Sequence, residues 1–117
     1  MTTPQEIFDA IKGQQQAITA IAEQLKGLLM SGSFTLADGE DLIDKIAMTM
    51  ASTDKSIEDI ESIEDVLSID QEDALSDMAG TAHDFGSEIL MLVMDKVRQI
   101  GGNPNLIYKA AQERHYP

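Results

Sequence analysis

The chain of 117 residues contains no cysteine and no tryptophan, and only five of its residues are aromatic and three are proline. The absence of cysteine excludes disulfides, thiolate metal sites and cysteine nucleophiles. Because aromatic residues are so few, a core has to be built from Ile, Leu, Val, Met and Ala. The N-terminal sequence MTTPQEIFDA is polar and acidic, unlike a signal peptide, and the longest fully apolar run is far too short to cross a membrane. We therefore expect a soluble, cytoplasmic protein with one domain, residues 1–117.

Positive charge is scarce, and over one long stretch it is missing altogether. Eight lysine and arginine residues stand against 21 acidic residues, which gives a net charge of −13. Between Lys55 and Lys96 there is no lysine or arginine, while twelve carboxylates occur. Such a surface repels phosphate, so direct binding to nucleic acid or to an anionic membrane is disfavoured. A chain that keeps so many like charges exposes them to solvent or neutralises them with a partner or a cation.

The first thirty residues predict one long helix. Thr3 is a suitable N-cap, Pro4 fits the first helical position, and Glu6 completes a capping box. A heptad stripe follows, made of Ile7, Ile11, Gln14, Ile18, Ile21, Leu25 and Leu28. Its single polar member, Gln14, either sets the register of a bundle or dimer or lies near solvent, and we expect the position near solvent. Gly32 is expected to end the helix.

The middle of the chain is less regular. A second helix is predicted to begin at Thr35, with Asp38 three residues further on. A break or bend is expected at residues 52–54, where Thr53 can cap a third helix that runs to about Ser68. In that third segment apolar residues recur at every third position: Ile57, Ile60, Ile63, Val66 and Ile69. Because such a stripe drifts by about 60° per step around a helix, the segment is either buried on a broad face or interrupted.

The last part of the chain predicts one long helix and one short helix. Asp70 and Asp73 form another capping pair, which opens a helix to about Ile100. Residues 89–94 are apolar around the whole helix circumference, so they lie at the centre of the fold or at an oligomer interface. Asn103 with the following proline opens the short helix. No strand pattern competes, and the predicted fold is all-α: an antiparallel bundle of three to four long helices plus a short C-terminal helix.

Patterns with catalytic potential are few, and they consist of carboxylates alone. The segments EDLID (residues 40–44) and ESIED (residues 61–65) place acids three and four residues apart, and two facing helices of this kind could hold Mg²⁺. They resemble the EExxE and ExxD helices of the all-α MazG-type nucleotide pyrophosphohydrolases over about 30 residues. The second motif departs from the family pattern at Ser62 or Glu64. The resemblance implies a Mg²⁺-dependent nucleotide pyrophosphohydrolase, whereas the residues themselves predict no enzyme, no cofactor and no bound metal.

The acidic stretch predicts either an ordinary solvated face or a binding surface for a basic protein partner. We favour the binding surface, on a small acidic interaction protein whose partner itself binds nucleic acid. Phage-encoded inhibitors use this device when they mimic nucleic acid by placing carboxylates where phosphates lie. The predicted contact residues are Glu58, Asp59, Glu61, Glu64 and Asp65. A second cluster, Glu40, Asp41 and Asp44, is expected to lie nearby.

The apolar block supports a different function, an oligomeric assembly factor or chaperone-like subunit. In that case the protein forms a homodimer, which we expect, and the basic C-terminal region can dock on the acidic segment of a neighbour. The predicted interface residues are Ile89, Leu90, Met91, Val93 and Met94.

Overall fold

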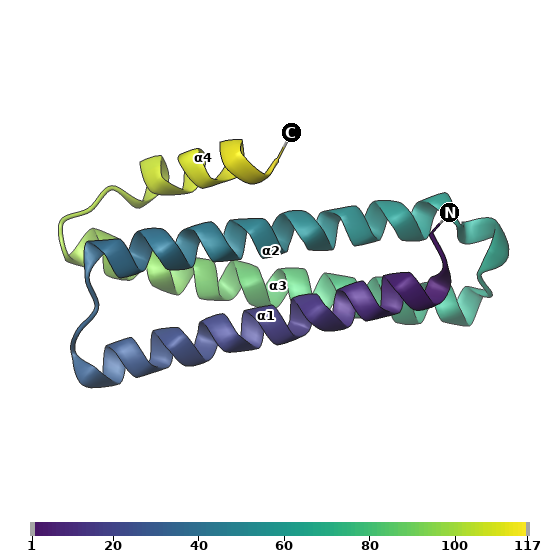
Figure 1. Ribbon diagram of the computed structural model, residues 1–117, viewed down its shortest axis with the longest axis horizontal. Helices are drawn as coiled ribbons and strands as arrows, with labels where there is room; N and C mark the ends of the chain where they lie inside the picture. The colour runs from purple at the N-terminus through teal and green to yellow at the C-terminus, as the bar shows by residue number, and fades with distance from the viewer. Residues whose placement is uncertain (1, 117) are drawn as a thin grey trace.

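The computed structural model describes residues 2–116, which form four α-helices and one short 3₁₀ helix. Three long helices lie side by side, each antiparallel to the next in the chain (Figure 1). The short helix α4 lies against α2, at the end of the bundle where α2 begins. The bounds are α1 Pro4–Ser31, α2 Leu36–Ser62, η1 Glu64–Val66, α3 Ile69–Gln99 and α4 Pro104–His115. The predicted all-α bundle with a short C-terminal helix is therefore confirmed, with three long helices. None of the described helices has a stretch apolar enough to cross a membrane.

The ends of α1 and the start of α2 follow the predicted caps, except that Glu6 does not complete the expected capping box. The Thr3 side chain accepts a hydrogen bond from the Glu6 backbone N–H at 3.2 Å, and Pro4 occupies the first turn. Gly32 adopts a φ of 68°, and this left-handed position ends α1. Thr35 and Asp38 form a complete capping box at the start of α2.

Of the two alternatives at residues 52–54, a break is wrong, because α2 continues unbroken to Ser62. The hydroxyl of Thr53 is buried and donates to the Met50 carbonyl at 2.7 Å, so it is satisfied inside the helix rather than acting as a cap. The chain is instead interrupted after Ser62, where η1 follows. The segment with apolar residues at every third position is therefore interrupted rather than buried on one broad face. As a result Val66 is left 70% exposed.

The start of α3 also differs from the prediction. Ser68 and Gln71 form the capping box of this helix, so the pair Asp70 and Asp73 does not cap it. Ser68 fits the N-cap rule equally well, and its glutamine partner at the third helical position completes the box. Asp70 and Glu72 lie in the first turn, where the positive end of the helix dipole favours carboxylates.

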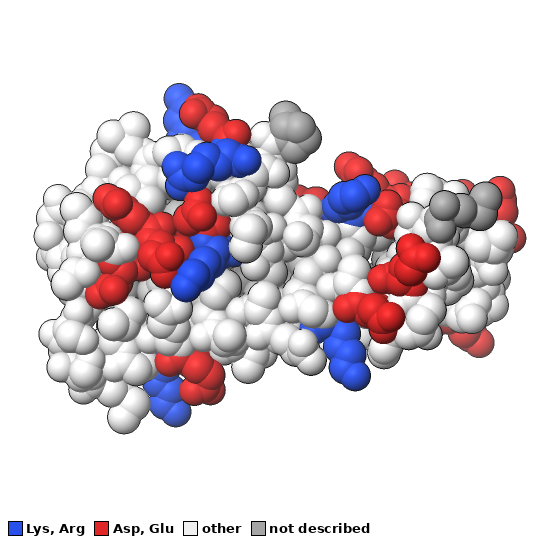
Figure 2. Space-filling model, in the orientation of Figure 1, with Lys and Arg blue, Asp and Glu red and all other residues white. Residues whose placement is uncertain are grey.

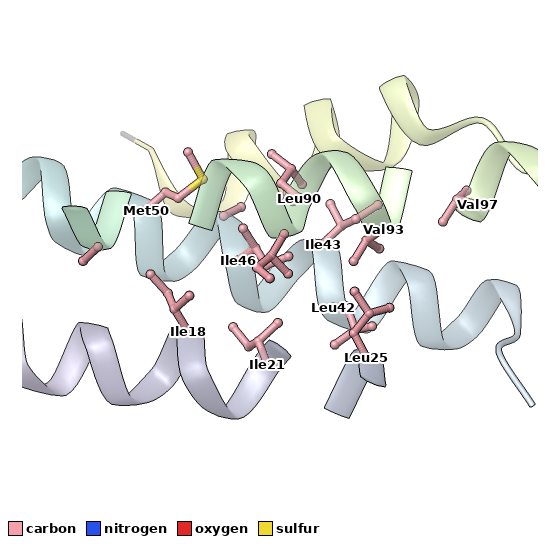
Figure 3. Close-up of a cluster of buried hydrophobic side chains, with 14 residues drawn as sticks. Ile18, Ile21, Leu25, Leu42, Ile43, Ile46, Met50, Leu90, Val93 and Val97 are labelled. Atoms are coloured by element: carbon pink, nitrogen blue, oxygen red, sulfur yellow. The ribbon is translucent and has the colours of Figure 1, made fainter. Parts of the chain in front are cut away.

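The core is aliphatic and lies along the axis of the three long helices. Figure 3 shows buried side chains of α1, α2 and α3 pointing toward one another, among them Ile18, Leu42 and Val93. A second buried cluster fills the bundle where α1 begins, formed by Ile7, Ile11, Ile60, Ile63, Leu75 and Ala79. All the residues of the heptad stripe in α1 except Leu28 are buried, and Leu28 is partly buried.

Gln14 is buried, so its expected position near solvent is wrong. Its side chain is 7% exposed, and its Nε2 donates to the Ser52 carbonyl at 3.0 Å and to the Ser56 hydroxyl at 2.9 Å. These bonds join α1 to α2 in the middle of the bundle. The polar residue of the heptad is therefore a buried contact between two helices of one chain, as in the alternative that the sequence also allowed.

Candidate protein-interaction surface

Negative charge is concentrated at the end of the bundle where α1 begins and α2 passes into α3. We call residues 2–12 and 55–77 the acidic end. Figure 2 shows the carboxylates of this end with few basic neighbours, whereas red and blue groups alternate at the opposite end. Against the two basic residues Lys12 and Lys55, the acidic end carries eleven carboxylates: Glu6, Asp9, Glu58, Asp59, Glu61, Glu64, Asp65, Asp70, Glu72, Asp73 and Asp77. Its net side-chain charge is −9, out of −13 for the whole chain.

At the opposite end of the bundle, carboxylates are paired with the chain's own basic groups. Lys45 Nζ lies 2.9 Å from Asp41, and Arg98 lies 2.9 Å from Asp95. Both pairs are between residues on the same helix. This end therefore carries little net charge for a partner to recognise.

Asp44 of α2 holds the C-terminal helix in place. Its Oδ1 accepts from Arg114 at 2.8 and 2.9 Å and lies 3.0 Å from His115 Nε2. Burial acts to raise the pKa of Asp44, but the hydrogen bonds and charges of Arg114 and His115 outweigh it and hold the pKa below its usual range. We call these three residues the α4 clasp.

Asp54 makes the second contact of α2 with the C-terminal segment. The Tyr116 hydroxyl donates to Asp54 Oδ2 at 3.0 Å, and His83 Nε2 of α3 lies 3.6 Å from Asp54 Oδ1. Burial and this hydrogen bond raise the pKa of Tyr116 above its usual range. The basic C-terminal region thus docks on carboxylates of its own α2.

The structure separates the two predicted clusters of contact residues. Glu58, Asp59, Glu61, Glu64 and Asp65 lie together at the acidic end, in the last turns of α2 and in η1. The cluster of residues 40–44 lies at the other end of the same helix, about 30 Å away at 1.5 Å per residue. An unbroken α2 cannot bring the two clusters together, so their expected proximity is wrong. Asp41 and Asp44 of the second cluster are paired with basic groups of the chain itself. In the first cluster, Asp59 lies 3.5 Å from Lys55 Nζ.

Exposed apolar residues within the acidic end were not identified as contact residues from the sequence. Val66 is 70% exposed and Ile69 is 77% exposed, on either side of the turn between α2 and α3. Both belong to the stripe in which apolar residues recur at every third position. Because such a stripe drifts around a helix, its members cannot all face the core, and this was the signal in the sequence for exposed apolar residues. A shallow groove lies close by, between the first turns of α1 and α3, lined by Pro4, Gln5, Phe8, Gln71, Ala74, Leu75 and Met78.

The predicted dimer interface is divided between core and surface. The core of the single chain buries Ile89, Leu90 and Val93, and Met94 packs against it. Most of the apolar block is therefore explained by the core of one chain. Met91 is 66% exposed. Homodimer formation through this block stays a prediction.

No candidate metal site links the carboxylate motifs of residues 40–44 and 61–65. The two motifs lie on or just after the same helix rather than on facing helices, and the distance between them prevents them from sharing a cation. Within residues 2–116 no group of three histidine, aspartate or glutamate side chains is arranged to hold a metal ion. The geometry therefore lends no support to the resemblance to the MazG-type pyrophosphohydrolases.

Comparison of the chain with protein-family models, with curated proteins and with solved structures found no match. No family assignment follows.

Proposed function

We propose that this protein is an acidic interaction module that binds a basic protein partner through the acidic end of its bundle. The observation that carries the proposal is the segregation of charge: eleven carboxylates and two lysines share one end of the bundle. A patch of one sign focuses its field and attracts a partner of opposite sign, raising the association rate. The partner expected from this chemistry presents a lysine- and arginine-rich surface, as nucleic-acid-binding proteins do.

Helix stability does not account for the carboxylates at the end of α2. Glu61 lies in the last turn of this helix, where the negative end of the dipole disfavours an anion by up to about 1 kcal/mol. The last turn contains no basic residue to compensate. Glu58 and Glu61 are also three residues apart, which adds a like-charge repulsion of a few tenths of a kcal/mol. A basic partner would relieve both costs.

Apolar residues at the acidic end complement the charges. Val66 and Ile69 are among the most exposed apolar side chains that the structure describes. In protein interfaces, binding energy comes mainly from desolvated apolar anchors, while surrounding charges set partner choice and association rate. An acidic surface with two such anchors is suited to a protein partner.

The experiment compares two variants of equal charge. The acidic-end variant carries Glu58→Gln, Glu61→Gln, Glu64→Gln and Asp65→Asn, all at exposed positions. The matched control carries Glu23→Gln, Asp84→Asn, Glu88→Gln and Glu113→Gln, also exposed but outside the acidic end. Each immobilised protein is used to capture partners from a host lysate in about 50 and 300 mM salt, a range over which the screening length shortens markedly. Captured proteins are quantified by mass spectrometry.

The proposal predicts that basic proteins bind to wild type and control in low salt and are lost from the acidic-end variant. Addition of DNA should displace a partner whose nucleic-acid-binding surface is occupied. Equal capture by all three proteins, or capture that ignores salt, would contradict the proposal, because neither outcome depends on the acidic end.

A further inference from the structure

The groove between α1 and α3 at the acidic end has an apolar floor. Phe8 is 37% exposed, and the groove it lines with Ala74, Leu75 and Met78 has a volume of about 270 Å³. Phe85 lies seven residues beyond Met78 on the same face of α3 and is 40% exposed. Met78 and Phe85 are therefore separated by about 10 Å along the helix axis, or about two turns.

The rim of this groove is acidic on both sides. On α1, Asp9 follows Phe8 directly and accepts a hydrogen bond from Gln5, itself part of the groove, at 2.9 Å. On α3, Asp70 and Asp77 are exposed and lie about one turn before and after Ala74 on its face of the helix. An apolar segment bound in the groove would therefore be flanked by carboxylates.

One basic residue also lies at this rim. The Lys12 ammonium is 5.9 Å from the centroid of the Phe8 ring. This places a cation of the chain itself over the aromatic ring that a bound apolar side chain would contact.

The chain itself shows how a short basic helix binds to this bundle. α4 is twelve residues long and packs Ile107, Tyr108 and Ala111 against the main core. At its end Arg114 and His115 reach the Asp44 carboxylate. The interaction combines an apolar face in contact with the bundle and basic side chains on a carboxylate of α2.

We propose that the groove between α1 and α3 binds a basic amphipathic helix of the partner, with its apolar face on Phe8 and Met78 and its lysine or arginine side chains on Asp9, Asp70 and Asp77. This inference rests on the proposed function and names the partner element. Charge selects this occupant over a second copy of the chain, since a symmetric dimer through the groove would bring two acidic ends together.

The probe is a synthetic 15-residue helical peptide of leucine, alanine and lysine with leucine at helical spacing. A scrambled peptide of the same composition serves as its control. Affinity is measured by fluorescence anisotropy with the full-length protein at low and high salt. Ala74→Gln fills the groove at an exposed helical position without changing charge, and Met78→Gln removes part of the apolar floor. Leu92→Gln, at a residue 58% exposed outside the acidic end, is the matched control.

The inference predicts that the amphipathic peptide binds about tenfold more tightly than the scrambled one, and that Ala74→Gln and Met78→Gln each remove most of that difference. Leu92→Gln should have no effect. Lys12→Gln should raise affinity about two- to threefold by freeing the Phe8 face, whereas Lys26→Gln, outside the acidic end, should not.

Three results would overturn the inference. Equal, salt-sensitive binding of both peptides, unaffected by the groove variants, would refute the groove while leaving the acidic end as a binding surface. Failure of both basic peptides to bind at low salt would refute the proposed function as well. A concentration-dependent dimer in light scattering that Ala74→Gln abolishes would assign the groove to a second copy of the chain.

Discussion

Replacement of Gln14 by leucine should stabilise the protein, although it removes two hydrogen bonds between α1 and α2. The Gln14 carboxamide donates to the Ser52 carbonyl and the Ser56 hydroxyl, but its Oε1 is buried and has no hydrogen-bond partner among residues 2–116. A net hydrogen bond contributes about 1 kcal/mol, and a buried carbonyl without a partner costs about 1–3 kcal/mol. The two effects nearly cancel, so the packing of the new side chain decides the sign.

The magnitude follows from burial. Gln14 is 7% exposed and continues a stripe of buried isoleucines, so a leucine there gains most of the roughly 1.5–3 kcal/mol of a buried aliphatic side chain. The groups left behind remain satisfied, because the Ser52 carbonyl already accepts within α2 and the Ser56 hydroxyl can turn to it. We expect Gln14→Leu to raise the free energy of unfolding by about 1–2 kcal/mol.

Urea unfolding followed by circular dichroism measures the change. Gln14→Ala serves as the comparison: it removes the same hydrogen bonds but leaves a cavity, and should lower the free energy of unfolding by about 1–3 kcal/mol. Equal destabilisation by leucine and alanine would refute the reasoning, because it would show that the carboxamide bonds outweigh apolar packing. Light scattering of each variant checks that the change in register contact does not create a dimer.

Three further predictions concern close packing and the α4 clasp. Gly39→Ala should lower the free energy of unfolding by about 1–3 kcal/mol because the new methyl group would overlap with Val97. Gly80→Ala should raise it by up to about 1 kcal/mol, because apart from its own helix backbone and chain neighbours no atom lies within 4 Å of the new methyl group. Asp44→Asn should lower it by about 1 kcal/mol and shift the amide NMR signals of α4, while Asp95→Asn, in a pair within one helix, should have a smaller effect. Because the pKa of Asp44 is lowered in the folded protein, the clasp should be intact above the ordinary aspartate pKa of about 4 and be lost as the pH falls through the folded pKa, which an NMR titration of α4 tests.

The fold was predictable from the sequence because each long helix has an apolar stripe and recognisable caps. Thr3 and Thr35 could be identified as N-caps from local sequence alone. The errors arose where one sequence signal has two structural uses. Thr53 can cap a helix or bond within one, and burial against neighbouring helices decided for the second. Ser68 and Asp70 both fit the N-cap rule, and only the complete box identifies Ser68.

The candidate surface was only partly predictable. Local sequence identified the carboxylates of residues 58–65, but not the carboxylates of α1 and α3 that share the same end, because chain direction in a bundle is a tertiary property. The same lack of tertiary information led to the expectation that Glu40 and Asp44 lie nearby. Pairing of Asp44 with Arg114 joins residues 70 positions apart, which no local pattern indicates.

Calorimetry with a basic partner recovered by capture tests the central claim most directly. The account predicts that the acidic-end variant, with four carboxylates neutralised, binds at least about tenfold more weakly than wild type at low salt, since each charge contributes a few tenths to 1 kcal/mol. The matched control variant, with the same net charge, should bind within about twofold of wild type. Equal loss of affinity in both variants would show that the partner senses only total charge, and would contradict a binding surface at the acidic end.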